Sequence, residues 1–165
     1  MSLRPAALII GAALIIGAGL PLAACQPSGG ATAVLERSPA GLEQTPLSIV
    51  TAAGKTHRFT VEVARTPGQQ EQGLMNREAI APDRGMIFPY DPPVAASFWM
   101  KNTLIPLDII FIRANGTIAR IEANTVPLSL DPVPAGEPVG AVLELAGGRA
   151  AELGIAPGDK VDWSR

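Results

Sequence analysis

LDIIFIRANGTIARIE, residues 107–122, is the stretch of this chain that decides its fold. Residues 107–112 are apolar apart from Asp108, which is typical of a strand buried in a sheet. Asn115 and Gly116 form a pair that favours the positive φ angles of a tight hairpin turn. The chain is therefore expected to turn there and to return as a second strand over residues 117–122.

Further short strands are expected on both sides of this hairpin. Residues 47–51 and 56–63 predict a first hairpin, and the apolar runs at residues 86–88 and 97–100 are separated by prolines. Two more strands are predicted over residues 141–145 and 160–163. A proline-bearing loop, residues 126–138, precedes the first of these.

Two short helices complete the predicted elements. Thr66-Pro67-Gly68-Gln69 is a capping-box start with proline in the first turn, and Gly73 is suited to end that helix. The second helix is expected over residues 149–153, ended by Gly154. Many short strands without long crossover helices predict a mainly β domain, either a β-sandwich or a partly open barrel.

The amino-terminal segment has the pattern of a lipoprotein signal. Arg4 precedes an uncharged apolar run at residues 6–20, and LAAC follows at residues 22–25. The run is short and rich in glycine, which argues against a membrane-spanning helix. The pattern is similar to bacterial lipoprotein signals, in which the cysteine carries two acyl chains. We therefore expect residues 1–24 to be a signal peptide and Cys25 to be the lipid anchor.

This anchor predicts that the protein is located in the bacterial cell envelope and faces the periplasm. Gln26 stands where enterobacterial lipoproteins of the inner membrane carry aspartate, so the outer membrane is favoured. In residues 26–46, 10 of 21 are Gly, Pro, Ser or Thr, which predicts a flexible tether over residues 25–46. A single folded domain is expected over residues 47–165.

Composition narrows the possible functions. The 165-residue chain carries a net charge of −2, which does not favour binding to nucleic acid. One cysteine and one histidine, His57, leave no framework for disulfides or for Cys/His zinc sites. Met75, Met86 and Met100 could together hold Cu(I), but core packing is the commoner role of methionine. We therefore expect no metal and no cofactor.

The densest group of polar residues follows Trp99. Lys101, Asn102 and Thr103 are consecutive hydrogen-bonding residues between apolar strands, as in a recognition loop on a β scaffold. The alternative is structural: Asn102 and Thr103 cap a turn, and Lys101 pairs with Asp108.

Asp108 is expected at the margin of the core, where a carboxylate needs a partner. Lys101, Arg77 and Arg120 are the available cations, and an ion pair is favoured over an acid–base role. Glu122 and Glu144 also lie in strand-like runs, and a pair of carboxylates facing one cleft would suit glycoside hydrolysis.

Several strings within residues 59–161 resemble one family. They are GLMNR at 73–77, GMIF at 85–88, FWMKNT at 98–103, PLDIIFI at 106–112 and LGIAPGD at 153–159. On these residues the chain is similar to the domain-of-unknown-function family 192. The resemblance implies a compact, mostly β domain of jelly-roll type, often exported and often lipid-anchored. It implies no activity.

Two hypotheses of function follow. The first is an envelope binding module, attached to the membrane through Cys25, for a small ligand or an envelope protein and not for nucleic acid. Its expected polar and aromatic cleft is lined by Arg77, Trp99, Lys101, Asn102, Thr103 and Asp108. The alternative is a small hydrolase that uses Asp108 with a second carboxylate. No residue is assigned a catalytic role.

Overall fold

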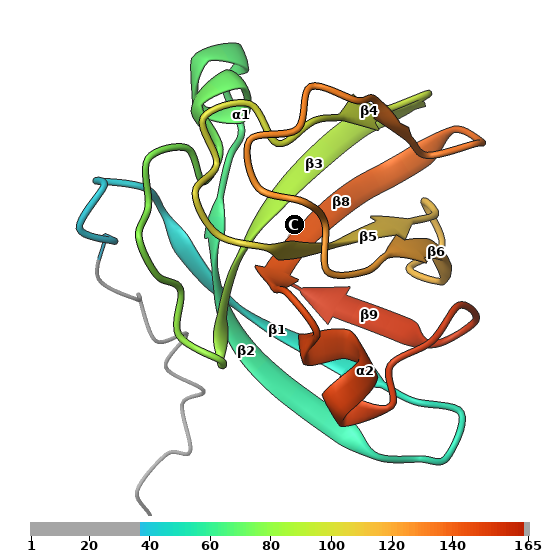
Figure 1. Cartoon of the computed structure of the whole chain (residues 1–165). Coiled ribbons are helices and arrows are strands. Elements are labelled where there is room, and N and C mark those ends of the chain that lie inside the picture. Colours follow the sequence, from blue (N-terminus) through green and yellow to red (C-terminus); the bar gives the residue numbers. More distant parts are fainter. Residues whose placement is uncertain (1–36, 164–165) are drawn as a thin grey trace, which may run out of the picture. The chain divides into compact units, whose positions relative to one another are not determined.

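Residues 37–163 are described by the computed structural model, and they form a mainly β domain with two short helices (Figure 1). The signal sequence and Cys25 lie outside these residues. The elements are β1 (Gln44–Val50), β2 (Thr56–Val63), α1 (Pro67–Gln72), β3 (Arg84–Val94), β4 (Ser97–Phe98), β5 (Leu107–Ile112), β6 (Ile118–Glu122), β7 (Val133–Pro134), β8 (Val139–Ala146), α2 (Arg149–Leu153) and β9 (Lys160–Trp163). Within the described part of the chain, none of the helices has the length and apolar character needed to cross a membrane.

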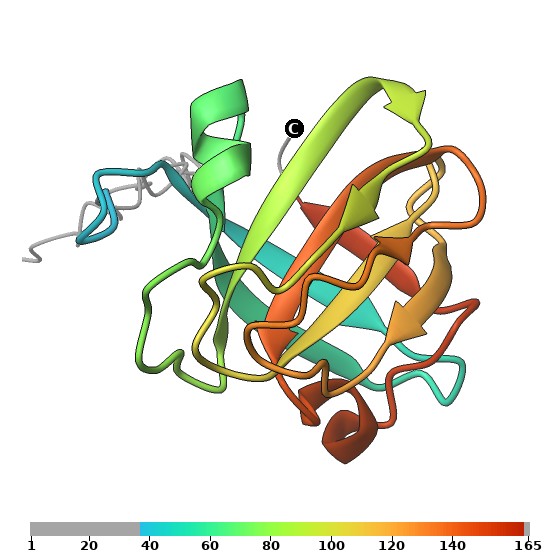
Figure 2. The same cartoon turned by 45° about the horizontal axis from the view of Figure 1, so that its top comes forward.

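Seven strands form one sheet in the order β6-β5-β8-β3-β2-β1-β9, and β4 pairs separately with β7. Neighbours in the large sheet are antiparallel except β2 and β3, which are parallel. The sheet curls until its two edges approach, where Thr117 forms a bridge with Lys160 (Figure 2). The domain is therefore a curled half-barrel, which confirms the expected mainly β fold with two short helices.

Strands β5 and β8 and residues 85–88 of β3 are buried on both faces because an apolar cluster lies on either side of them. The first cluster fills the inside of the curled sheet, and α2 contributes Ala150 to it. The second lies on the opposite face, where Met86, Phe88, Ile109 and Phe111 are covered by the segments around α1 and β4. All six residues of β5 are buried, as the apolar run predicted.

The predicted hairpin between β5 and β6 is present, but its turn differs from the expected one. Gly116 has a φ of 80°, whereas Asn115 is not among the residues with positive φ. The Asn115 side chain instead accepts a hydrogen bond from the Thr117 backbone N–H at 3.0 Å. The turn is therefore longer by one residue than predicted, with a left-handed glycine after an ordinary turn. Gly116 is needed because a Cβ atom there would lie 2.8 Å from the Val161 carbonyl oxygen.

Helix α1 begins as the sequence predicted. The Thr66 side chain accepts a hydrogen bond from the Gln69 backbone N–H, and the Gln69 side chain accepts one from the Thr66 N–H. Gly73 forms the carboxyl-terminal cap. This reciprocal capping satisfies two of the helix's free N–H groups, so a helix of six residues holds a fixed position.

Strand β3 is longer than expected because it continues through its prolines. Pro89 still pairs with Ala141 of β8, and the register then shifts before Val94 pairs with Val139. Proline has no N–H to donate, so it is tolerated where the ladder is interrupted. One long strand thus carries both Phe88, which pairs with Val142 of β8, and Tyr90.

The domain also begins before the expected residue 47. Strand β1 starts at Gln44, and Leu42 is 8% exposed within the second apolar cluster. The Leu42 backbone is held by Ser38, whose N–H donates to the Leu42 oxygen at 2.9 Å. Residues 37–46 therefore belong to the folded domain in the structure, and the predicted tether boundary at residue 46 is too late.

Candidate functional site

Glu144 is a buried carboxylate in the centre of the sheet. Strand β8 alternates between the two apolar clusters, and Glu144 lies opposite Met86 of β3 and Ile109 of β5. It is 5% exposed. Its Oε2 atom is buried and has no hydrogen-bond partner among residues 37–163. An unpartnered oxygen of this kind is costly, so its presence points to a role outside the packing of the domain.

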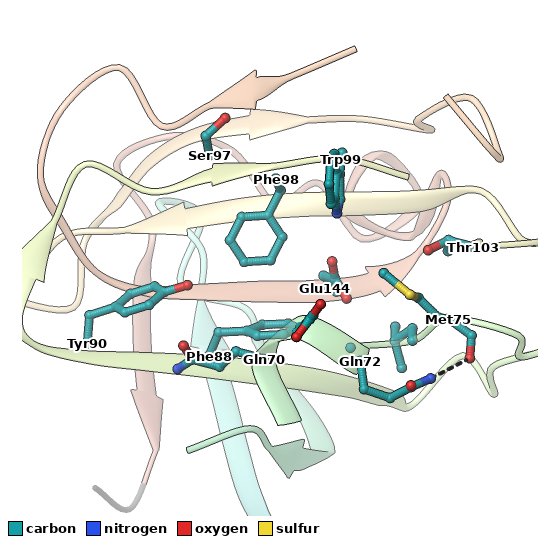
Figure 3. A pocket seen from close by; sticks show the side chains of 13 residues that line it. Gln70, Gln72, Met75, Phe88, Tyr90, Ser97, Phe98, Trp99, Thr103 and Glu144 are labelled. Atoms are coloured by element: carbon teal, nitrogen blue, oxygen red, sulfur yellow. Dashed lines mark hydrogen bonds between the residues drawn. The ribbon is translucent and has the colours of Figure 1, made fainter. Parts of the chain in front are cut away.

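A pocket of about 270 Å³ lies over Glu144 (Figure 3). Its walls come from α1 and the residues after it, from β3, and from the segment that starts at β4. The side chains shown around it face a common space in which the Glu144 carboxyl group lies. The lining residues are Gln70, Glu71, Gln72, Gly73, Leu74, Met75, Phe88, Tyr90, Ser97, Phe98, Trp99, Thr103 and Glu144.

Aromatic rings form much of this wall. Phe98 packs edge-to-face against Phe88, with ring centroids 5.0 Å apart, and against Phe111, at 6.3 Å. These contacts fix the Phe98 ring against the second apolar cluster. Trp99 is 49% exposed and stands at the rim, which is unusual for so large an apolar side chain.

Helix α1 is held over the pocket by Gln70. The Gln70 side-chain amide donates to the Ala64 oxygen at 3.1 Å and to the Pro89 oxygen at 3.4 Å. These bonds connect the helix to the end of β2 and to β3. Gln72 donates to the Met75 oxygen at 3.4 Å, which orders the turn after the helix. The pocket is therefore built from elements whose positions are fixed by hydrogen bonds.

Burial shifts the protonation of two groups at the pocket. It raises the pKa of Glu144 to about 8, and the positive charge of Arg77 acts in the opposite direction. Burial and the Glu144 charge together raise the pKa of the Tyr90 phenol to about 12. At neutral pH the empty pocket thus presents a mostly protonated carboxyl group and a neutral phenol.

Arg77, a predicted cleft residue, is committed to another carboxylate. Its two terminal nitrogens donate to the two oxygens of Glu62 at 2.6 and 2.7 Å. The hydrogen bonds that Arg77 donates to Glu62 are the main reason that the pKa of Arg77 is raised. Arg77 acts on Glu144 only through its charge, because none of its hydrogen bonds within the described residues reaches that carboxylate.

Two of the six predicted cleft residues, Trp99 and Thr103, line the pocket. Lys101 lies beside it, with its ammonium nitrogen 5.1 Å from the centroid of the Trp99 ring. Asn102 has a φ of 54° and shapes the turn: its carbonyl accepts from the Asn76 N–H at 2.8 Å. Within the polar run after Trp99, Thr103 thus lines the pocket, whereas Asn102 has a structural role in the turn.

Asp108 lies outside the pocket and has no exposed surface. Its carboxylate accepts three backbone hydrogen bonds, from Asn124 at 2.7 Å, Gly148 at 2.8 Å and Ala150 at 2.7 Å. The expected ion pair with Lys101 is therefore wrong, because the lysine ammonium lies over Trp99 and backbone N–H groups satisfy the aspartate. Neither Arg77 nor Arg120 replaces it: they pair with Glu62 and Glu122.

The residues that sequence reasoning missed are the aromatic side chains of β3 and β4, the face of α1 and the central role of Glu144. One signal for Glu144 was present: it is the single charged residue in the apolar run VGAVLELA of β8. Nothing in the sequence indicated that residues 70–75 would lie over it, because that contact depends on how the sheet curls.

Two of the three methionines contact polar side chains through their sulfur atoms. Met100 is buried and its sulfur accepts a hydrogen bond from the Thr125 hydroxyl at 3.1 Å. The Met75 sulfur is 3.9 Å from the Asn102 amide nitrogen instead. Among residues 37–163 no group of three or more His, Cys, Asp or Glu side chains is placed to hold a metal ion.

Comparison with known proteins identifies relatives over most of the domain. A model of the DUF192 family, described as an uncharacterised ACR, matches residues 48–163. A crystal structure of a protein of unknown function from Novosphingobium aromaticivorans DSM 12444 is similar, with a TM-score of 0.75 and 47% identity. The match covers 78% of this chain and 91% of that chain.

A second similar crystal structure comes from Sinorhizobium meliloti 1021, where the protein is provisionally described as a transcription regulator. It has a TM-score of 0.73 and 44% identity, over 74% of this chain and 95% of that chain. None of the curated proteins compared matches the chain.

Proposed function

The chain belongs to the DUF192 family, and because that family is uncharacterised, we propose from the pocket itself that the domain binds a small organic ligand. The observation that carries this proposal is the Glu144 carboxyl group, which lines the pocket and whose buried Oε2 atom has no hydrogen-bond partner among the described residues. A ligand group bound there would supply the missing hydrogen bond. The same site therefore explains why a costly carboxyl group is kept in the sheet.

The pocket has the other features of a small-molecule site. Its volume of about 270 Å³ is close to the lower end of the usual range for ligand pockets, about 300 Å³. Aromatic rings provide apolar contact area, while Glu144, Thr103 and the α1 glutamines provide a few polar groups. This mixture of apolar walls and few polar atoms is typical of binding sites that orient one ligand.

A larger hollow elsewhere on the domain supports binding less well. One of about 580 Å³ lies beside Glu62, Arg77 and Arg84. Its charged side chains already have partners: Arg77 binds Glu62, and Arg84 donates to Gln44 at 3.0 Å. A larger volume without an unsatisfied group gives a ligand less to bind.

Hydrolysis through Asp108 is not favoured by its position. The carboxylate is fully buried and accepts three backbone hydrogen bonds, which leaves it no contact with the pocket. A role in transcription, as attributed to the Sinorhizobium relative, is not favoured by the net charge of −2.

The proposal includes the expected anchor: the domain is held at the envelope, facing the periplasm, by lipid on Cys25. Its support is the sequence alone, the apolar run at residues 6–20 followed by LAAC at residues 22–25. Cys25→Ser should abolish labelling of the protein by a radioactive fatty acid in cells, with the unaltered chain as control. Labelling that persists in the serine variant would contradict the anchor.

A screen tests the binding proposal. The full-length chain, purified in mild detergent, is heated with each member of a library of small polar and aromatic compounds. A ligand at 100 times its Kd adds about 2.7 kcal/mol to the free energy of unfolding, which is a clear shift in Tm. The stabilising compounds should lose their effect on Glu144→Gln and on Trp99→Ala, and keep it on Asp162→Asn, which lies outside the pocket. No stabilising compound, or stabilisation equal in all variants, would contradict the proposal.

A further inference from the structure

Resting on this proposed function, we propose further that the ligand class is a small organic ammonium ion with an aromatic or other apolar body. Its N–H group would donate to Oε2 of Glu144, and its apolar body would lie against the rings of the pocket wall. The argument depends on the charge of the lining, on the unpartnered oxygen and on the aromatic rings.

The charge of the pocket favours a cation. Among its lining residues, all within the described part of the chain, the charged side chains are Glu71 and Glu144. Glu71 is exposed, and Glu144 is buried. No lysine, arginine or histidine is among these lining residues to bind an anion. Lys101, over Trp99, and Arg77, bonded to Glu62, are nearby cations but do not line the pocket, so the lining itself offers an anionic ligand two carboxyl groups and no cation.

Within residues 37–163, no side chain or backbone group donates a hydrogen bond to Glu144 Oε2. Arg77 is the cation whose charge reaches this carboxyl group, but its two terminal nitrogens are bonded to Glu62. A cation with N–H groups that binds such a buried carboxylate directly offsets part of the cost of burying its charge. An ammonium group has those N–H donors, and its positive charge would pair with the negative charge of the buried carboxylate.

The aromatic wall provides a second attraction for a cation. Phe88, Tyr90, Phe98 and Trp99 all line the pocket, and ring faces attract ammonium groups. The domain already contains such a contact, because the Lys101 ammonium lies 5.1 Å from the centroid of the Trp99 ring. Rings together with a buried carboxylate form the combination used to recognise organic ammonium ions.

This ligand class predicts an affinity that rises with pH. A cation binds the ionised form of Glu144, whereas the empty pocket holds it protonated below a pKa of about 8. Binding must therefore release a proton wherever Glu144 is protonated, and the affinity should rise about tenfold from pH 6 to pH 7 and about fivefold from pH 7 to pH 8. The charged and titratable groups around Glu144 are Arg77, held by Glu62, with Tyr90 on β3 and Glu71 on α1.

Three probes of similar size and different charge test the inference. Benzylammonium, benzyl alcohol and benzoate are titrated into the full-length chain at pH 6, 7 and 8, and binding is measured by calorimetry and by NMR shifts. We expect benzylammonium to bind at least tenfold more tightly than the other two at pH 8. Its affinity alone should rise with pH across this range.

Variants separate the buried carboxylate from a general effect of charge. Glu144→Gln keeps the shape of the side chain and removes its charge, so it should abolish both the preference for benzylammonium and its pH dependence. Glu78→Gln removes a negative charge from an exposed residue outside the pocket and should change the affinity less than threefold. Circular dichroism checks that both variants are folded.

The remaining outcomes each contradict the inference. If benzyl alcohol or benzoate binds best, and Glu144→Gln weakens it, the ligand class is wrong while the proposed binding function stands. If benzylammonium binds equally well to Glu144→Gln, the site of the cation is wrong. If no probe binds although the library screen finds ligands that depend on Glu144, the ammonium class is wrong and the pocket is still a binding site.

Discussion

The Asp108 carboxylate accepts a hydrogen bond from the backbone N–H of Ala150 at 2.7 Å, so a strand residue caps a helix 42 positions later in the chain. Helix α2 needs this help because its own cap residue, Gly148, has no side chain to offer. The Gly148 N–H also donates a hydrogen bond to the Asp108 carboxylate, at 2.8 Å. Asp108 therefore fixes the position of α2 against β5 and has no free oxygen directed to the pocket.

Replacement of Asp108 by alanine should destabilise the domain strongly. The change leaves three buried or partly buried backbone N–H groups without an acceptor, each costing about 1 to 3 kcal/mol. We expect the free energy of unfolding in urea to fall by about 3 kcal/mol or more. Amide exchange at Ala150 should accelerate, since that N–H loses its partner. Asp162→Asn, an exposed aspartate on β9, is the control and should change stability by less than about 0.5 kcal/mol.

Lys101 and Asp108 should show no energetic coupling. The lysine ammonium lies over Trp99, and the aspartate is satisfied by backbone groups, so the two side chains share no contact. In a double-mutant cycle with Lys101→Met and Asp108→Asn, the two changes in unfolding free energy should add to within about 0.5 kcal/mol. A coupling above about 1 kcal/mol would show that the pair forms in solution after all.

Local patterns in the sequence predicted the elements well because their causes are local. The capping box at Thr66 and the prolines and glycines that bound the helices act over three or four residues. The strand β5 was recognisable because a run of apolar residues fits a strand buried on both faces. Even the end of α2 at Gly154, with a φ of 69°, follows from one residue's conformational freedom.

The candidate site was predicted only in part, since it depends on contacts between distant segments. The string around Trp99 was correctly singled out, yet only Trp99 and Thr103 of the six chosen residues reach the pocket. Asp108 and Glu144 are both acids within apolar strands, and the sequence alone does not separate them. What separates them is that α2 supplies N–H groups to Asp108, while nothing described supplies one to Glu144 Oε2.

Leu42 should contribute to stability although the sequence placed it in a flexible tether. It is 8% exposed and packs in the second apolar cluster, with its backbone bonded to Ser38. Leu42→Ala is expected to lower the unfolding free energy by about 2 kcal/mol, as for a leucine at the edge of a core. Leu130→Ala is the matched control, because Leu130 is 66% exposed and should cost less than about 0.5 kcal/mol. Equal effects of the two changes in urea unfolding would place Leu42 outside the folded domain.

Glu144 should make the domain less stable as pH rises from about 4.5 to 8. The pKa of Glu144 is 4.5 for the free side chain and about 8 in the folded domain, where burial disfavours the charge. Between these values the folded state binds a proton that the unfolded state has released. The contribution of Glu144 to the free energy of unfolding is therefore fully present below pH 4.5. It is lost progressively up to about pH 8, by at most about 1.4 kcal/mol per pH unit.

Glu144→Gln tests this prediction because the amide cannot titrate. Urea unfolding of both proteins at pH 5, 6, 7 and 8 should give a difference in free energy that grows with pH in favour of the variant. All other side chains are the same in both proteins, so their contributions cancel in that difference. Parallel pH profiles would mean that Glu144 keeps an ordinary pKa, and hence that water or a protein donor reaches Oε2. A growing difference would instead show that the ionised Glu144 carboxylate destabilises the domain when no ligand is bound. A bound cation would offset that destabilisation.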